Sequence, residues 1–175
     1  MIRTALVASL SVLALTAGAQ AQEEGKYTLG AGYERIDFDG VDLDTVVFRG
    51  GYDFSEYFGV EGQVNIGLGD ESVTVGAVTG DVSLDYAAGL FGVFRPYSTD
   101  NGNVFIRAGY TTAQVDASAA GFSVSEDEDG WAYGVGGEYF FDGVNGVRFD
   151  YTRFDYDAGA EADVYGVSYV RRFGG

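Results

Sequence analysis

Cysteine and histidine are absent from this chain of 175 residues, proline occurs once, and 10 basic residues stand against 27 acidic ones. The absence of cysteine excludes disulfide scaffolds, thiolate nucleophiles and Cys-ligated zinc sites. The absence of histidine excludes Ser-His catalysis, His-metal sites and the usual proton shuttle near neutral pH. The formal charge of −17 opposes contact with the phosphates of nucleic acid, so we expect no nucleic-acid partner.

Glycine and aromatic residues are abundant instead. The chain has 28 Gly, 13 Tyr, 13 Phe and one Trp, and 46% of its residues are hydrophobic. So many glycines would indicate disorder in a polar chain, but the hydrophobic and aromatic content favours ordered structure. The length suits a single domain.

Residues 1–21 have the pattern of a secretory signal peptide. Arg3 supplies the positive start, residues 5–15 are mostly apolar, and the small residues Ala19 and Ala21 form an A-x-A cleavage site. An uncleaved anchor is the alternative, but the apolar stretch is shorter than the ~20 residues that a spanning helix needs. We therefore expect Sec-type export, removal of residues 1–21 and a mature domain over residues 22–175.

The mature chain alternates between apolar and polar residues with a period of two. In residues 58–68, Phe, Val, Ile and Leu alternate with Gly, Glu, Gln and Asn, which predicts an amphipathic strand. Seven further segments alternate in the same way: 26–36, 45–54, 81–94, 103–115, 130–141, 146–154 and 163–173. We predict an all-β fold of eight strands.

The connections between these segments differ in length. The short or turn-like ones are 55–57, 96–102, which contains the only proline, and 142–145. The longer ones are 69–80, 116–129 and 155–162, with 37–44 of intermediate length. Short turns at one end and longer, acidic loops at the other are typical of an antiparallel up-and-down transmembrane β-barrel, with the longer loops on the cell surface.

The volume of the side chains predicts which face of the strands points outward. Eighteen aromatic residues lie on the apolar faces: Tyr27, Tyr33, Phe48, Tyr52, Phe54, Phe58, Tyr86, Phe94, Tyr110, Trp131, Tyr133, Tyr139, Phe141, Phe149, Tyr151, Tyr165, Tyr169 and Phe173. An eight-stranded barrel is too narrow to enclose them, so we expect the apolar face to meet lipid and the lumen to be narrow and polar. Many of these rings lie near predicted strand ends, where aromatic girdles of membrane barrels occur.

The last predicted strand alternates up to a terminal aromatic residue through Tyr165, Val167, Tyr169 and Phe173. Together with the signal sequence and the eight alternating segments, it resembles the small OmpA/OmpX-type outer-membrane β-barrels. The resemblance implies location in the outer membrane of a Gram-negative bacterium. It also implies that these four residues form the C-terminal signal read by the outer-membrane assembly machinery.

Charged residues on the opposite face predict a network in the lumen. Its expected members are Glu34, Arg49, Glu61, Asp85, Arg107, Glu138, Arg148, Asp150 and Arg172. Symmetric closure of the hairpins predicts Glu34 opposite Arg49, and Glu138 opposite both Arg148 and Arg107, with Glu61 diagonal to Arg49. Opposite charges on neighbouring strands stabilise a sheet, so the network would plug the lumen. A charged constriction that selects ions or small solutes is the alternative.

No catalytic residue is predicted, because a plugged lumen admits no sugar between paired carboxylates and no histidine is available as a base. No cofactor and no metal site are predicted either. The acidic run Glu126, Asp127, Glu128 and Asp129 is a weak Ca²⁺ or Mg²⁺ candidate, since its ligand spacing matches no known loop motif. Arg35 and Arg153 lie on the outward face near the same rim, where they could meet lipid phosphates.

These observations favour a monomeric structural or surface-interaction barrel that contacts outer-membrane lipid and lipopolysaccharide. A narrow porin-like channel for ions or small solutes is the first alternative. A soluble periplasmic carrier of the lipocalin type is the second, and it would be extracted without detergent.

Overall fold

The computed structural model describes residues 25–38, 41–75, 78–119, 122–156 and 159–174, and within 70–83 and 115–127 it describes the backbone alone. The predicted signal peptide and its cleavage residues Ala19 and Ala21 lie outside this part of the chain. No helix of the described residues is long and apolar enough to cross a membrane.

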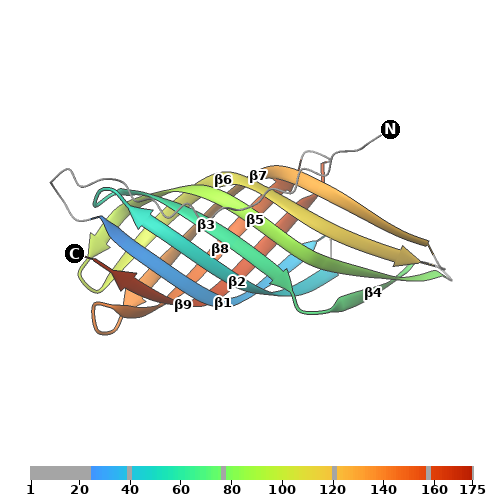
Figure 1. The fold of residues 1–175 in the computed structure, drawn as a ribbon, viewed down its shortest axis with the longest axis horizontal. Coiled ribbons are helices and arrows are strands. Elements are labelled where there is room, and N and C mark those ends of the chain that lie inside the picture. Colours follow the sequence, from blue (N-terminus) through green and yellow to red (C-terminus); the bar gives the residue numbers. More distant parts are fainter. Residues whose placement is uncertain (1–24, 39–40, 76–77, 120–121, 157–158, 175) are drawn as a thin grey trace.

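The described chain forms one antiparallel sheet that closes into a barrel (Figure 1). Its strands are β1 (Lys26–Phe38), β2 (Val41–Asp53), β3 (Phe58–Gly67), β4 (Asp70–Val75), β5 (Val78–Thr99), β6 (Gly102–Ala119), β7 (Phe122–Phe140), β8 (Asn145–Tyr156) and β9 (Glu161–Phe173). The order is β3-β2-β1-β9-β8-β7-β6-β5-β4, and pairing of β3 with β5 closes the ring. Eight of these strands make the barrel, so the predicted fold is confirmed.

The additional strand, β4, corrects the prediction of a long loop over residues 69–80. β4 pairs with β5 from Asp70 opposite Ser83 to Val75 opposite Val78. The predicted loop at 116–129 is likewise a hairpin, because β6 and β7 stay paired up to Ala119 opposite Phe122. Cross-strand pairing satisfies backbone groups that an irregular loop would leave to water.

Strand length shows how far this hairpin region extends. β5, β6 and β7 have 22, 18 and 19 residues, whereas β1, β2, β3, β8 and β9 have 10 to 13. In Figure 1, β4 and the tips of β5, β6 and β7 continue past the ends of the other strands. We call residues 70–83 and 115–129 the protruding sheet.

Pro96 lies inside β5 and not in a turn, which corrects the sequence-based prediction. The register between β5 and β6 shifts between Phe94 and Tyr97. Proline lacks a backbone N–H and is tolerated at such irregularities. The turn itself comes later, after Thr99 pairs with Gly102.

The apolar strand faces point outward, as predicted. Sixteen of the eighteen expected outward rings are exposed, and only Tyr52 and Tyr151 are half-buried. The exposed fractions reach 62% at Trp131 and Phe149. This arrangement is opposite to that of a soluble carrier barrel, which holds its apolar side chains inside.

Glycines inside the strands make room for the larger side chains of the lumen. A Cβ atom added at Gly136 would lie 2.8 Å from the Cβ of Asp150 and would also contact the ring of Phe105. A Cβ at Gly166 would lie 3.1 Å from Glu34 Oε1. Separations near or below 3 Å force neighbouring atoms to move, so the dense lumen requires glycine here.

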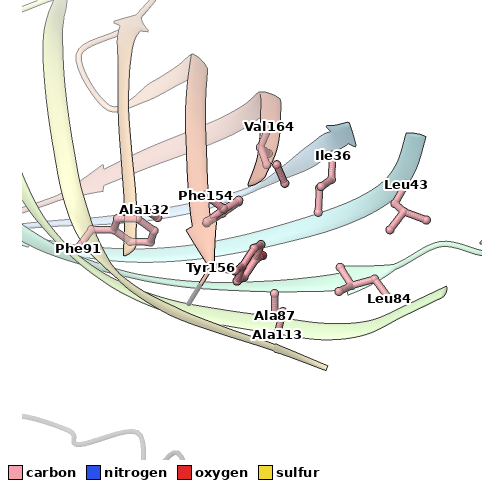
Figure 2. Packing of buried hydrophobic residues seen from close by; sticks show 11 residues of the cluster. Ile36, Leu43, Leu84, Ala87, Phe91, Ala113, Ala132, Phe154, Tyr156 and Val164 are labelled. Carbon is pink, nitrogen blue, oxygen red and sulfur yellow. The ribbon is translucent and has the colours of Figure 1, made fainter. Parts of the chain in front are cut away.

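Part of the lumen is lined by an apolar cluster, which the alternation pattern did not predict. Figure 2 shows side chains of this cluster pointing into the barrel interior. Its members are Ile36, Leu43, Leu84, Ala87, Phe91, Ala113, Ala132, Phe154, Tyr156, Ala162 and Val164. Most lie toward the hairpins of β1–β2, β6–β7 and β8–β9, so this end of the lumen is packed with hydrocarbon.

Candidate functional site

A layer of charged side chains fills the lumen between the apolar cluster and the short turns. Seven of the nine predicted network residues are at most 7% exposed: Glu34, Arg49, Glu61, Arg107, Glu138, Arg148 and Asp150. They come from β1, β2, β3, β6, β7 and β8, where strand alternation turns them inward. The structure therefore brings together side chains from most of the ring of strands.

Two carboxylates stand at the centre of this layer. Asp150 Oδ2 lies 3.1 Å from Nη2 of Arg49 and 3.1 Å from Nη2 of Arg107. Its Oδ1 lies 3.0 Å from Nε of Arg148. Asp150 thus forms an ion pair with each of three buried arginines, Arg49, Arg107 and Arg148.

Glu61 contacts the same three arginines. Its Oε1 lies 3.0 Å from Arg107 Nη1 and 4.0 Å from Arg49 Nε. The same oxygen accepts a hydrogen bond of 3.1 Å from Arg148 Nη2. Each guanidinium is therefore shared by both carboxylates, and charge-assisted bonds of this kind are among the stronger hydrogen bonds in proteins.

Glu34 and Glu138 complete the charged layer. Arg49 Nη2 pairs with Glu34 Oε1, and Arg148 Nη1 lies 3.5 Å from Glu138 Oε1. The other oxygen of Glu138 accepts a 2.8 Å hydrogen bond from Asn103 Nδ2. Four carboxylates thus face three guanidinium groups in this layer.

Neutral polar side chains, which the sequence analysis missed, complete the hydrogen bonding. Gln63 Oε1 accepts bonds of 2.6 Å from Arg107 Nη1 and 3.1 Å from Arg49 Nε. Ser168 Oγ accepts a 2.7 Å bond from Arg49 Nη1, and Thr152 Oγ1 accepts a 3.0 Å bond from Arg107 Nε. These residues share the inward alternation of the charged ones, which is the signal that could have found them.

Phenylalanine rings cover the arginines from within the lumen. The guanidinium carbon of Arg148 lies 4.2 Å from the ring centroid of Phe105, and that of Arg107 lies 4.5 Å from Phe91. Both rings are at most 1% exposed. A cation over an aromatic face is attracted by the ring quadrupole, so the rings fill space and stabilise the charges together.

Asp85 lies outside the network, which corrects its prediction as a lumen residue. β5 pairs Leu84 with Val115 and Tyr86 with Gln114, so Asp85 is an extra residue in the ladder. An extra residue reverses the alternation on one side of it, and Asp85 is exposed. Arg172 is half-buried, and its guanidinium carbon lies 3.8 Å from the ring centroid of Phe140.

The register tests the predicted cross-strand pairs. Glu138 is opposite Arg148, as predicted, and Glu61 is diagonal to Arg49, which faces Gln63. Direct opposition of Glu34 and Arg49 was wrong, because Glu34 faces Thr45, four positions before Arg49 on β2; the long side chains still form an ion pair.

The predicted pairing of Arg107 with Glu138 was also wrong. Arg107 faces Gly134, and Glu138 faces Asn103. The pairing of β6 with β7 continues to Ala119 opposite Phe122, so the hairpin turns earlier in the chain than symmetric closure about residue 122 required.

Two matching clusters lie on the outer surface near the long-hairpin end. Arg35 lies 3.2 Å from Asp44, which also accepts a hydrogen bond from the hydroxyl of Tyr33. Arg153 lies 3.1 Å from Asp163, which accepts a 2.7 Å bond from the hydroxyl of Tyr151. Both arginines expected to face lipid phosphates are thus already paired with carboxylates.

A groove of about 760 Å³ lies between the clusters, with Tyr33, Arg35, Tyr151 and Tyr165 in its lining.

The acidic run at 126–129 lies in β7 and not in a loop. Glu128 is half-buried and Asp129 is exposed. The side chains of Glu126 and Asp127 lie outside the described part of the structure; among the described side chains, no group of three or more acidic residues is arranged to hold a metal ion. The predicted assembly residues Tyr165, Val167, Tyr169 and Phe173 are all exposed on β9.

Comparison with known proteins agrees with this architecture. The family described as "Outer membrane protein beta-barrel domain" matches residues 6–173. The crystal structure of Ail, the attachment invasion locus protein of Yersinia pestis, is 18% identical with a TM-score of 0.60, covering 87% of this chain and all of Ail. Ail is also known in complex with the heparin analogue sucrose octasulfate.

Two further solved structures are similar in fold. The outer membrane protein OprG from Pseudomonas aeruginosa is 14% identical with a TM-score of 0.65, covering 87% of this chain and 97% of OprG. Neisserial surface protein A is 8% identical with a TM-score of 0.60, covering 87% of this chain and all of that protein. A search of the curated proteins found no match.

Proposed function

Because this chain belongs to the outer membrane protein β-barrel domain family, we propose that it is a non-conducting outer-membrane barrel with a surface-interaction role. The proposal includes Sec-type export with loss of residues 1–21. It also includes assembly through the C-terminal strand, contact with lipopolysaccharide, and a monomeric state. Location in the outer membrane follows from the family and from its solved relatives.

The single observation that carries the proposal is the buried layer of charged side chains in the lumen. Three arginines and four carboxylates, each at most 7% exposed, form one connected layer. The apolar cluster lies next to it, and apart from the Tyr156 hydroxyl its side chains offer an ion no polar atom. An ion crossing the barrel would have to break buried pairs and then enter hydrocarbon, and both steps are costly.

The protruding sheet supports the surface role. Long hairpins at one end and short turns at the other are the pattern of outer-membrane barrels, in which the longer connections are extracellular. The sheet therefore extends into the medium under this proposal. Its acidic character favours basic partners and opposes polyanions such as the heparin analogue seen with Ail.

Planar-bilayer recording tests the non-conducting lumen. The protein is refolded in detergent, and folding is verified by its change in gel migration on boiling in SDS. We expect the bilayer current to stay at its baseline after insertion of the folded protein. Steady, ion-selective single-channel steps from the pure protein would establish the porin-like alternative instead.

A matched variant makes the recording sharper. Replacing Glu61 and Arg148 together with Ala removes one central carboxylate and one of its partners from the layer. If this layer is the barrier, the double variant conducts more often than the wild type. If neither protein conducts, the proposal of a non-conducting wild type stands. In that case the apolar cluster is a sufficient barrier in the double variant.

A further inference from the structure

A sequence motif occurs twice in the chain, in two hairpins that are neighbours in the barrel. Residues 33–38 are Tyr-Glu-Arg-Ile-Asp-Phe and residues 151–156 are Tyr-Thr-Arg-Phe-Asp-Tyr, so tyrosine, arginine and aspartate recur at the same spacing. The first copy ends β1 and the second ends β8, and β9 lies between these strands and pairs with both. The groove between the two clusters lies over this junction of strands.

Aromatic and aliphatic side chains make up most of the groove wall. They are Tyr33, Val135, Phe149, Tyr151, Tyr165 and Val167. The ring centroids of Tyr151 and Tyr165 lie 5.3 Å apart. The volume of about 760 Å³ is within the range of about 300–1,000 Å³ that is usual for small-molecule sites. The groove is therefore large enough to hold part of a lipid.

Each copy of the motif places one arginine beside two carboxylates, on the side of the groove toward the β1–β2 and β8–β9 turns. The ion pairs are Arg35 with Asp42 at 3.7 Å and with Asp44 at 3.2 Å, and Arg153 with Glu161 and with Asp163, the latter at 3.1 Å. One positive charge and two negative charges give each cluster a formal net charge of −1. The side chain of Asp150, which also borders the groove, faces the lumen arginines and adds no charge at this surface.

Tyrosine hydroxyls connect the carboxylates to the groove. Tyr33 donates a hydrogen bond to Asp44, and Tyr151 donates one of 2.7 Å to Asp163. These bonds hold both rings at the groove wall, next to the acceptors that carry the excess negative charge. Aromatic faces and carboxylates both attract a cation, so an ammonium group would be stabilised here from two sides. A phosphate would instead compete with two carboxylates for each arginine.

The polarity of the groove changes along the strands. Its tyrosines lie next to the charged clusters, and tyrosine is enriched where a membrane meets water. Phe149 and Val167 face each other two positions farther from the β8–β9 turn than Tyr151 and Tyr165, which also face each other. A molecule with its charged end at the clusters and its apolar end along Phe149 and Val167 would have the orientation of a lipid in the outer leaflet.

We propose that this groove binds a membrane lipid with an ammonium headgroup. The ammonium group would lie between the tyrosine rings and the carboxylates of the two clusters, and an acyl chain would lie along Phe149 and Val167. The proposal goes beyond the surface-interaction role and rests only on the placement of the barrel in the outer membrane.

Solution NMR of the refolded full-length protein in dodecyl maltoside micelles tests the proposal, because this detergent carries no charge. The probe is dodecyltrimethylammonium, added at increasing mole fraction of the micelle. Dodecyl phosphate has the same chain with an anionic head, and tetramethylammonium has the same head without a chain. We expect saturable nuclear Overhauser effects from the N-methyl protons of the probe to the rings of Tyr33 and Tyr165. Neither control compound should occupy the groove at the same concentration.

Two double variants with the same change in charge separate the groove from the overall charge of the protein. Asp44→Asn with Asp163→Asn neutralises one carboxylate of each cluster. Glu56→Gln with Asp100→Asn neutralises two exposed carboxylates near the short turns. We expect the first variant to bind the probe about tenfold more weakly and the second to bind as the wild type does. Folding of each variant is verified by its change in gel migration on boiling in SDS.

A tyrosine substitution tests the aromatic wall separately from the charge. Tyr165→Leu keeps an apolar side chain and removes the ring, so we expect binding about threefold weaker. Tyr86→Leu is the matched control, because Tyr86 is an exposed outward ring on β5 and does not line the groove.

Equal loss of binding in the two charge variants would overturn the proposal, because general attraction to a negative protein would then explain it. Tighter binding of dodecyl phosphate would overturn it in favour of a lipopolysaccharide phosphate. Equally tight binding of tetramethylammonium, or probe contacts outside the groove only, would overturn it as well. Bilayer recording is independent of these outcomes, so failure here leaves the non-conducting lumen standing.

Discussion

Glu61 on β3 and Asp150 on β8 contact the same three guanidinium groups, those of Arg49, Arg107 and Arg148. The two carboxylates are 89 positions apart in the chain, and β3 and β8 are not neighbours in the sheet. Their shared partners therefore connect strands across the lumen that no backbone ladder joins. This interior connection is a second set of constraints on the shape of the barrel.

Replacing Glu61 with Ala should strongly destabilise the barrel. The variant leaves three arginines in a layer with one central carboxylate fewer, and removing one partner of a buried pair typically costs about 3–5 kcal/mol. The measurement is the free energy of unfolding in denaturant for protein refolded in detergent. Glu56→Ala is the matched control, because Glu56 is exposed in a short turn and should change stability by less than about 0.5 kcal/mol. Equal effects of the two variants would contradict the central role of Glu61.

Arg148→Ala should destabilise the barrel more than Glu138→Ala. Arg148 contacts Glu61, Asp150 and Glu138, and its guanidinium also packs on Phe105. Glu138 has a longer ion pair of 3.5 Å with Arg148 and a hydrogen bond from Asn103. Unfolding of the two single variants and the double variant measures their coupling. A larger loss from Glu138→Ala would show that the pair is not organised around Arg148. Neither variant should conduct in a bilayer.

Gly136→Ala should destabilise the barrel by about 1–3 kcal/mol, because overpacking a filled interior forces side chains from their preferred positions. The new methyl group would meet Asp150 and Phe105, both in the lumen. Gly62→Ala is the control, since the nearest atom to its added Cβ is the Gly50 carbonyl oxygen at 3.9 Å. We expect denaturant unfolding to show a loss for Gly136→Ala and little change for Gly62→Ala. Comparable losses would mean that strand glycines matter through the backbone and not through lumen volume.

Asp142 should make the turn between β7 and β8 sensitive to acid. Its Oδ1 accepts a hydrogen bond of 2.9 Å from the backbone N–H of Val144, and its Oδ2 accepts one of 2.7 Å from the Asn145 side chain. Hydrogen bonds from the backbone and side chain of Asn145, followed by that from Val144, lower the pKa of the Asp142 carboxyl.

The direction of this shift sets the pH range of the effect. A carboxyl whose pKa is lower when folded contributes stability above the usual Asp pKa of about 3.9, and this contribution is lost as the pH falls through the folded pKa. The stability difference between wild type and Asp142→Ala should therefore be constant near neutral pH and shrink in acid. Unfolding from pH 7 down to about 2 measures it. Asp142→Asn has no titrating group at this position, so its stability difference from Asp142→Ala should not change with pH. A stability difference between wild type and Asp142→Ala that is independent of pH would contradict the prediction.

The period-two alternation was sufficient to predict the barrel and the outward face, because lipid and lumen impose opposite polarity on neighbouring residues. It failed locally at Asp85, since an extra residue in β5 reverses the alternation there without any obvious sequence signal. It also underestimated β5, β6 and β7. Acidic and small residues at 116–129 indicate a loop by composition, but the cross-strand ladder continues through them.

Register was the hardest feature to predict. The turn at 142–145 is tight and contains Gly143 with a positive φ of 77°, so symmetric closure placed Glu138 opposite Arg148 correctly. The β1–β2 turn is displaced from the assumed centre, which moved Glu34 away from direct opposition to Arg49. The flexible reach of arginine brought the two side chains together in spite of this shift. Contacts across the lumen, such as Arg107 with Glu61 from β3, depend on barrel closure and have no local sequence signal.

The pairing of β1 with β9, from Tyr27 opposite Phe173 to Asp37 opposite Asp163, has a kinetic consequence. The barrel cannot close until the last strand has been synthesised and delivered, and a ladder between the two ends of a chain forms slowly because its loop-closure entropy is large. Arg49 illustrates this delay, because its hydrogen bond to Ser168 spans 119 positions. Until closure occurs, Arg49 can reach Glu34 on the neighbouring strand, but it lacks Ser168. We therefore expect burial of the arginines to be a late event in folding, coincident with the closure of an open sheet into a barrel.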